Sequence, residues 1–271
     1  MTFGQLNKVQ QQLLLFAAKF GYLNKRIFFE CSHLKARSYK YRAWTGLLDL
    51  QLLSPYKRRI FAQEYFYLNK RGLALLRAKG IDPVGKVNPI YFEHDDTIMQ
   101  FAMIAESSGL IKLNWINEGV LKKLPATRIH EIFNNSVIKL PDLVFELNLK
   151  NPTIKVALEV ERSAKNQVRY DSLVIGYSKA KSVDLVLVVH ANSFTRQAIL
   201  VSMRKLGYPK SQRPIAFIDY NDFLINPKTA VLELDGRRIS FQEYVQNIQR
   251  LSEKTGDKQG DLQSLNLSPR N

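Results

Sequence analysis

The stretch IKLPDLVFELNLKNPTIKVALEVE, residues 138–161, decides the fold of the second part of this 271-residue chain. Two apolar runs, 138–147 and 154–161, flank a short polar connection that contains a proline. Runs of this length that are rich in Val, Ile, Leu and Phe are typical of β-strands. The pair therefore predicts a β-hairpin, with acidic residues on both of its strands.

Three carboxylates of this hairpin stand among apolar residues. Asp142 follows a proline, and Glu159 lies 17 residues later, two residues before Glu161. Residues two apart on a strand face the same side, so Glu159 and Glu161 are expected on one face. Buried acids need partners, and carboxylates are the ligands that Mg²⁺ or Mn²⁺ prefers. The pattern indicates either a metal site at Asp142 and Glu159 or an exposed face whose acids pair with Lys165 and Arg169.

Helices and strands alternate around the hairpin. Helices are expected over 95–107, 117–124, 164–180, 194–206 and 240–251, and strands over 110–115, 184–189, 215–218 and 231–234. The continuous apolar run 184–189 is typical of a strand that is buried on both faces. This alternation predicts an α/β (α+β) domain with a mixed sheet over 89–251. The polar residues 252–271 are expected to form a disordered tail.

Residues 1–88 show a different pattern. Helices are expected over 10–20, 24–29, 38–52 and 70–79, with a basic hairpin at 57–59 and an aromatic strand over 64–68. Gly21 is placed to end the first helix, and Asn24 and Ser38 are placed to cap the next two. Three helices, a basic hairpin and a last helix follow the order of a winged helix-turn-helix domain.

The positive charge of the chain is concentrated in this first part. The net charge is +16, and residues 1–88 hold 16 Lys and Arg against 4 Asp and Glu, whereas 89–251 hold 21 against 17. Such a concentration is typical of a surface that binds nucleic acid. In a winged helix the third helix enters the major groove and the wing holds phosphates. The residues expected to contact double-stranded DNA are Arg37, Tyr39, Lys40, Arg42, Lys57, Arg58 and Arg59.

Composition excludes several other function classes. The single cysteine, Cys31, rules out an intramolecular disulfide and a multi-cysteine zinc site. His94, His130 and His190 are too scattered to form a metal site, so structural roles are expected for them. Glycine-rich phosphate loops are absent from the sequence. No apolar run reaches the roughly 18–20 residues of a membrane span, and the amino terminus is too polar for a signal peptide, so a cytoplasmic location is expected.

The motif Leu140-Pro141-Asp142-Leu143, followed by Leu158-Glu159-Val160-Glu161, resembles that of PD-(D/E)XK nucleases. The resemblance implies that Asp142 and Glu159 hold Mg²⁺ or Mn²⁺ and that Glu118 is a glutamate added by an earlier helix. Those nucleases carry a lysine where Glu161 stands, so either Lys165 replaces that lysine or the site is catalytically dead. The candidate catalytic residues are Glu118, Asp142, Glu159, Glu161 and Lys165.

The span 13–206 resembles the replication-relaxation family of plasmids and other mobile elements. The match rests on the order of short motifs, which are YFYLNKRG at 65–72, His94-Asp95, Trp115 with Glu118, Pro141-Asp142 and Glu159-Val160-Glu161. Members of this family join a winged helix to a degenerate nuclease-like domain. The resemblance implies a DNA-binding protein that acts in replication, mobilisation or DNA processing.

Two other function classes fit the same charge distribution. One is a non-enzymatic winged-helix transcriptional regulator whose second domain dimerises or senses a signal. The other is a scaffold that docks a relaxase, a replication initiator or a transposition protein, since some winged helices bind proteins. The expected partners are thus double-stranded DNA, one of these proteins or a second copy of the chain. Metal-dependent nicking of plasmid DNA distinguishes the enzyme from both alternatives.

Overall fold

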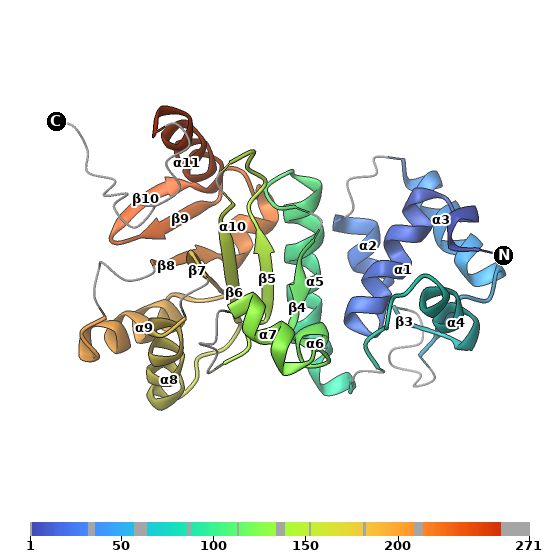
Figure 1. The fold of residues 1–271 in the computed structure, drawn as a ribbon, viewed down its shortest axis with the longest axis horizontal. Helices are drawn as coiled ribbons and strands as arrows, with labels where there is room; N and C mark the ends of the chain where they lie inside the picture. Colours follow the sequence, from blue (N-terminus) through green and yellow to red (C-terminus); the bar gives the residue numbers. More distant parts are fainter. Residues whose placement is uncertain are drawn as a thin grey trace.

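The computed structural model describes residues 2–31, 36–56, 64–85, 88–112, 114–133, 139–151, 153–180, 183–208 and 214–255. These residues form two parts that lie side by side (Figure 1). The first part is mainly helical and has a small three-stranded sheet, and the second is a mixed α/β structure built on a seven-stranded sheet. No helix within the described ranges is long and apolar enough to cross a membrane.

The elements of the first part follow the order expected from the sequence. They are η1 (Phe3–Gln5), α1 (Lys8–Phe20), β1 (Leu23–Asn24), α2 (Lys25–Cys31), α3 (Arg37–Asp49), β2 (Leu53–Pro55), β3 (Tyr65–Leu68) and α4 (Lys70–Ala78). Strand β3 pairs antiparallel with both β1 and β2. Helix α1 ends at Gly21, whose φ of 75° is readily adopted only by a residue without a β-carbon. Helix α3 begins at Arg37, so Ser38 lies inside the helix and does not cap it.

The second part contains the mixed sheet. Its elements are η2 (Pro89–Tyr91), α5 (Phe92–Ser107), β4 (Ile116–Asn117), α6 (Glu118–Leu121), α7 (Ala126–Phe133), β5 (Leu143–Glu146), β6 (Lys155–Glu161), α8 (Gln167–Ser178), β7 (Leu185–His190), α9 (Ser193–Lys205), β8 (Ile215–Asp219), α10 (Tyr220–Ile225), β9 (Val231–Leu234), β10 (Arg237–Ser240) and α11 (Phe241–Thr255). The strand order is β10-β9-β8-β7-β6-β5-β4. Strands β6, β7 and β8 are parallel, and the remaining pairings are antiparallel.

Helices cover both faces of this sheet. Helices α8 and α9 pack on the face that carries Val186 and Val188, whereas α5 and α10 pack on the face that carries Leu187. All six residues of β7 are buried, as expected of an apolar run with helices on both sides. Figure 1 shows α5 between the sheet and the first part of the chain, so this helix contacts both.

Three expected boundaries in the second part are wrong. Of the strand expected over 138–147, the described residues form 143–146, after Pro141, which has no N–H to add to the ladder. The strand expected over 110–115 is reduced to one bridge between Ile111 and Leu147. Helix α11 continues to Thr255, so residues 252–255 are helical, and the rest of the expected tail lies outside the described residues.

One continuous hydrophobic core joins the two parts of the chain. The rings of Tyr65 and Phe92 stack with centroids 4.4 Å apart, and the ring of Phe16 lies 5.0 Å from that of Trp115. Lys19 of α1 places its ammonium 3.6 Å from the Trp115 ring centre and donates to the Trp115 carbonyl at 2.8 Å. Burial lowers the pKa of Lys19 to about 8. The chain therefore packs as a continuous body across residue 88.

Candidate functional site

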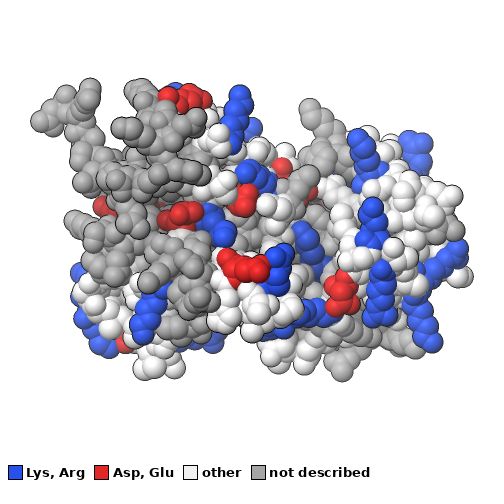
Figure 2. All heavy atoms as spheres, viewed as in Figure 1, with Lys and Arg blue, Asp and Glu red and all other residues white. Residues whose placement is uncertain are grey.

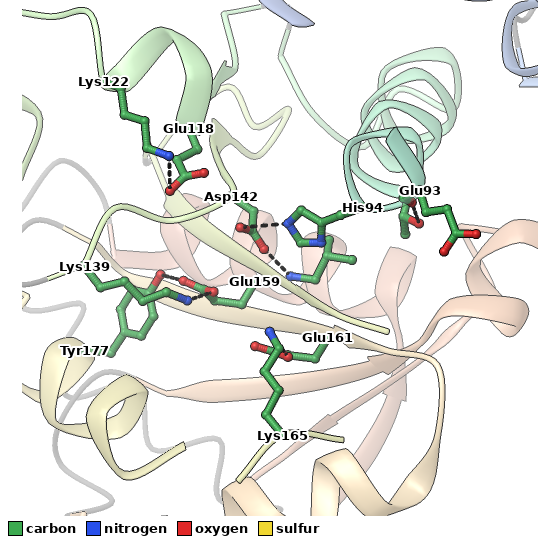
Figure 3. Close-up of polar contacts among 12 residues, drawn as sticks. Glu93, His94, Glu118, Lys122, Lys139, Asp142, Glu159, Glu161, Lys165 and Tyr177 are labelled. Atoms are coloured by element: carbon green, nitrogen blue, oxygen red, sulfur yellow. Dashed lines mark hydrogen bonds and ion pairs between the residues drawn. The ribbon is translucent and has the colours of Figure 1, made fainter. Parts of the chain in front are cut away.

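The acidic hairpin forms as the sequence predicts. Strands β5 and β6 pair antiparallel with Leu143 opposite Leu158, and this register, continued by one residue, places Asp142 opposite Glu159. The Asp142 N–H donates to the Leu158 carbonyl at 3.1 Å and holds the turn before β5 against β6. Asp142 and Glu159 are both buried, at 8% and 1% exposure. We call these two carboxylates and the side chains that contact them the acidic centre (Figure 3).

Asp142 is bound by a histidine and by the backbone. His94, near the start of α5, lies with Nε2 3.3 Å from Oδ1 of Asp142, and the Val160 N–H donates to Oδ2 at 2.7 Å. Burial disfavours the carboxylate, but His94 and the nearby Lys139 outweigh burial and hold the pKa of Asp142 below its usual value. Burial likewise opposes protonation of His94, yet its hydrogen bond to Asp142 and that residue's charge raise the pKa of His94. The pair is therefore arranged to carry opposite charges.

Glu159 has two side-chain partners of its own. The Tyr177 hydroxyl of α8 donates to Oε1 at 2.5 Å, and the ammonium of Lys139 contacts Oε2. Burial, followed by the negative charge of Asp142, raises the pKa of Glu159 to about 7, although Lys139 and Tyr177 favour the ionised form. Burial also raises the pKa of Tyr177 well above its usual value, so this phenol stays protonated and can donate.

The other candidate acids lie beside this centre with separate partners. Glu161 is buried, and its Oε2 lies 2.5 Å from Nζ of Lys165, which precedes α8. The Glu118 backbone N–H donates to the Asp142 carbonyl, but its side chain is 39% exposed and pairs with Lys122 at 3.0 Å. The structure thus brings Asp142 and Glu159 together, whereas the Glu118 carboxylate pairs with Lys122 (Figure 3).

The alternative of a solvent-exposed acidic face is wrong for this hairpin. Asp142, Glu159 and Glu161 are all buried, because helix α8 covers their side of β6. Lys165 does pair with one of these acids, as that alternative expected, but the exposed Arg169 side chain forms no salt bridge with any residue that the structure describes. Partners for the remaining two acids come from elsewhere in the chain.

A divalent metal needs carboxylate oxygens that are free to coordinate it. All four carboxylate oxygens of Asp142 and Glu159 already contact protein groups, namely His94, the Val160 N–H, Tyr177 and Lys139. Within the described ranges, no three His, Cys, Asp or Glu residues are grouped so that they would hold a metal ion. In this arrangement the residues do not fit Mg²⁺ or Mn²⁺.

Sequence reasoning missed three residues of the acidic centre. His94 was expected to be structural because the histidines are too scattered to form a metal site. This histidine lies 48 residues from Asp142, and nothing local connects the two. Tyr177 reaches Glu159 only through the packing of α8 on the sheet. Lys139 did leave a signal, since it is a lysine between two apolar residues just before the Pro-Asp pair. A charge in that position indicates a nearby acid.

Helix α3 presents an exposed basic and aromatic face. Arg37 and Arg42 are exposed, and neither forms a salt bridge with the residues that the structure describes. Tyr39 and Tyr41 are also exposed, at 39% and 56%. Figure 2 shows Lys and Arg outnumbering Asp and Glu on the visible face of the first part. These four side chains are free to contact a partner.

The expectation that Lys40 contacts DNA is corrected by the structure, because Lys40 is not a surface residue. Its side chain is buried, and its ammonium donates to the Phe29 carbonyl of α2 at 2.7 Å. Burial lowers the pKa of this lysine. Lys40 therefore ties α3 to α2 and does not lie on the exposed face of α3. The expected wing residues Lys57, Arg58 and Arg59 lie outside the described residues.

Comparison with known proteins adds no assignment. No protein family, no curated protein and no solved structure matches this chain. Inference about its function therefore rests on the geometry and charge described above.

Proposed function

We propose that this protein binds double-stranded DNA through the exposed face of α3. The observation that carries this proposal is the placement of Arg37, Tyr39 and Arg42 on that face, where neither arginine has an acidic partner among the described residues. Unpaired guanidinium groups attract phosphates, and a helix of this size fits the major groove. The net charge of residues 1–88 favours the same partner.

The fold assignment that accompanies this function is a winged helix followed by a PD-(D/E)XK-like domain. The order α1, α2, α3, β2, β3 and α4, with β1 completing a small antiparallel sheet, supports the first half. The antiparallel β5–β6 hairpin with Asp142 opposite Glu159 supports the second half. With the resemblance to the replication-relaxation family, these features favour a role on the DNA of a mobile element.

DNA binding is tested by its dependence on salt. Each phosphate contact contributes roughly 0.9 to the slope of log affinity against log salt, so Arg37→Ala with Arg42→Ala should lower the slope by up to ~1.8 and weaken binding. The matched control is Arg169→Ala with Arg204→Ala, which removes two exposed arginines from α8 and α9 in the second part. Equal slopes for the wild type and the α3 variant would remove α3 from the proposal.

Cleavage of DNA is the second candidate function. One observation favours it, the placement of two buried carboxylates opposite each other on the β5–β6 hairpin. Cleavage also requires that a metal ion displace the protein groups that occupy their oxygens in this arrangement, Lys139 among them. The test is nicking of supercoiled plasmid by the full chain with Mg²⁺ or Mn²⁺, run beside Asp142→Ala. Nicking that is lost in this variant, while DNA affinity is kept, would establish the enzyme. If the wild-type protein does not nick the plasmid, DNA binding without cleavage remains the proposed function.

A further inference from the structure

We propose that the ammonium of Lys139 takes the place of a divalent cation in the acidic centre. Lys139 contacts Oε2 of Glu159, and it lies near enough to Asp142 for their charges to interact. The centre thus contains two buried carboxylates and a positive charge that the chain itself supplies. This inference does not depend on the proposed DNA binding.

The charges of the centre need such a cation. Two carboxylates buried opposite each other repel, and burial of either one without compensation is costly. His94 balances Asp142 from the side of α5, and Lys139 balances Glu159 from the side of α8 (Figure 3). When Glu159 is ionised, these two cations bring the centre close to neutrality, which allows both carboxylates to stay buried.

Lys139 is placed to do this without a metal. Lys139 lies three residues before Asp142 in the chain. Its Cβ lies close to Gly176 of α8, because a β-carbon added to that glycine would be 3.9 Å from the Lys139 Cβ. The side chain is 35% exposed and reaches inward to a glutamate that is 1% exposed. The ammonium therefore enters the centre from its rim.

Lys165 does not provide this charge. Its ammonium lies 2.5 Å from the carboxylate of Glu161, which is two residues after Glu159 on β6. Lys139 and Lys165 are thus two lysines that each pair with a buried glutamate of the same strand, but only Lys139 contacts an acid that faces Asp142. This similarity makes Lys165 a matched control.

The proposal predicts that removal of Lys139 creates a metal site. The change frees Oε2 of Glu159 and removes one positive charge, which leaves carboxylate oxygens available to a hard cation. Wild type and Lys139→Met, both full length, are titrated with Mn²⁺, and unbound Mn²⁺ is followed by electron paramagnetic resonance. We expect Lys139→Met to bind Mn²⁺ at least about tenfold more tightly than wild type, and Lys165→Met to behave like wild type.

A second substitution locates the gained site. Glu159→Gln in the Lys139→Met background should abolish the gained Mn²⁺ binding, because it removes a charged ligand and keeps the shape of the side chain. Lys139→Gln provides a polar variant if Lys139→Met does not fold. Wild type that binds Mn²⁺ as tightly as a Lys139 variant, or a folded Lys139 variant that gains no binding, overturns the proposal.

The wild-type titration decides the matter even if neither Lys139 variant folds. If wild type binds Mn²⁺ and Glu159→Gln abolishes that binding, a metal ion can enter the acidic centre beside Lys139, which contradicts the proposal. If wild type binds no Mn²⁺, the proposal is supported. Because no DNA is present, failure of this inference and failure of the proposed DNA binding are read separately.

Discussion

The Tyr22 hydroxyl, in the first part of the chain, donates a 2.8 Å hydrogen bond to Asp96 of helix α5 in the second part. The same carboxylate accepts from the Asn24 amide at 2.8 Å and from the Tyr65 hydroxyl at 2.7 Å. Asp96 thus accepts hydrogen bonds from the residue before β1, from β1 itself and from β3. Two residues earlier on the same helix, His94 binds Asp142. Helix α5 therefore fixes the helical part of the chain relative to the acidic centre.

Replacement of Asp96 tests how strongly the two parts are joined. Asp96→Ala removes an acceptor that three donors share, although the Tyr22 hydroxyl keeps the Phe92 carbonyl at 3.3 Å. Each hydrogen bond lost by a buried group costs about 1–3 kcal/mol. We expect the free energy of unfolding to fall by about 3 kcal/mol, measured by urea denaturation. The control is Glu93→Ala on the same helix, because the Glu93 side chain is 87% exposed and its ion pair with Arg162 should contribute less than about 1 kcal/mol. Similar losses in both variants would contradict this role for Asp96.

Close packing of α4 leads to a second prediction. A β-carbon on Gly72 would lie 2.3 Å from the Leu52 carbonyl oxygen, because α4 rests directly on the chain that follows α3. Alanine normally favours a helix over glycine by roughly 1 kcal/mol, but this clash should reverse the sign and cost about 2 kcal/mol. Thermal or urea denaturation of Gly72→Ala measures the loss. Gly4→Ala is the control, since nothing lies within 4 Å of its added β-carbon, and greater stability of Gly72→Ala than wild type would show that α4 packs differently.

The burial of Lys40 leads to a third prediction, which separates structure from net charge. Lys40→Met should leave the slope of log DNA affinity against log salt unchanged. The Lys40 ammonium donates to the Phe29 carbonyl and does not lie on the solvent-exposed face of α3. The substitution should lower the free energy of unfolding by about 1 kcal/mol through loss of that hydrogen bond. Arg42→Ala, two residues away, should lower the salt slope and leave the free energy of unfolding nearly unchanged. A fall of about 0.9 in the salt slope of Lys40→Met would place this lysine at the DNA.

The sequence predicted those features that depend on neighbouring residues. The apolar stripe of α1 and Gly21 located that helix, and the apolar run of β7 indicated a central strand. Lys40 was open to the same reasoning, because it shares a helical face with Ala43, Trp44 and Leu47, at intervals of three, four and seven residues. The pattern itself places this lysine on the buried side of α3, whereas the charge alone suggested a contact with DNA.

The partners of the acids depend on packing between distant segments. The pairing of Asp142 with Glu159 follows from the hairpin and was predictable, but the approach of His94 requires α5 to lie across that end of the sheet. The contact of Tyr177 requires the docking of α8. Such placements are set by the whole core, which no local periodicity specifies. The acids of the candidate site were therefore found from the sequence, whereas most of their partners were not.

The raised pKa of Glu159 gives the last prediction, a dependence of stability on pH. The ordinary pKa of a glutamate, 4.5, applies to the unfolded chain, and burial followed by the charge of Asp142 raises it to about 7 in the folded protein. Between these values the folded state binds the proton more strongly, so this residue contributes stability below pH 4.5 that is lost as the pH rises to about 7. The slope from a single group is at most about 1.4 kcal/mol per pH unit.

Comparison of wild type with Glu159→Gln isolates this contribution from other groups that titrate in the same range, among them Asp95, whose pKa burial raises to about 6. The free energy of unfolding of each protein is measured by urea denaturation from pH 4.5 to 7.5. As the pH rises, wild type should lose stability relative to Glu159→Gln, because only wild type must ionise a buried carboxyl group at this position. A difference that is constant over this range, or that changes in the opposite direction, would mean that Lys139 and Tyr177 hold Glu159 ionised throughout and outweigh the effect of burial.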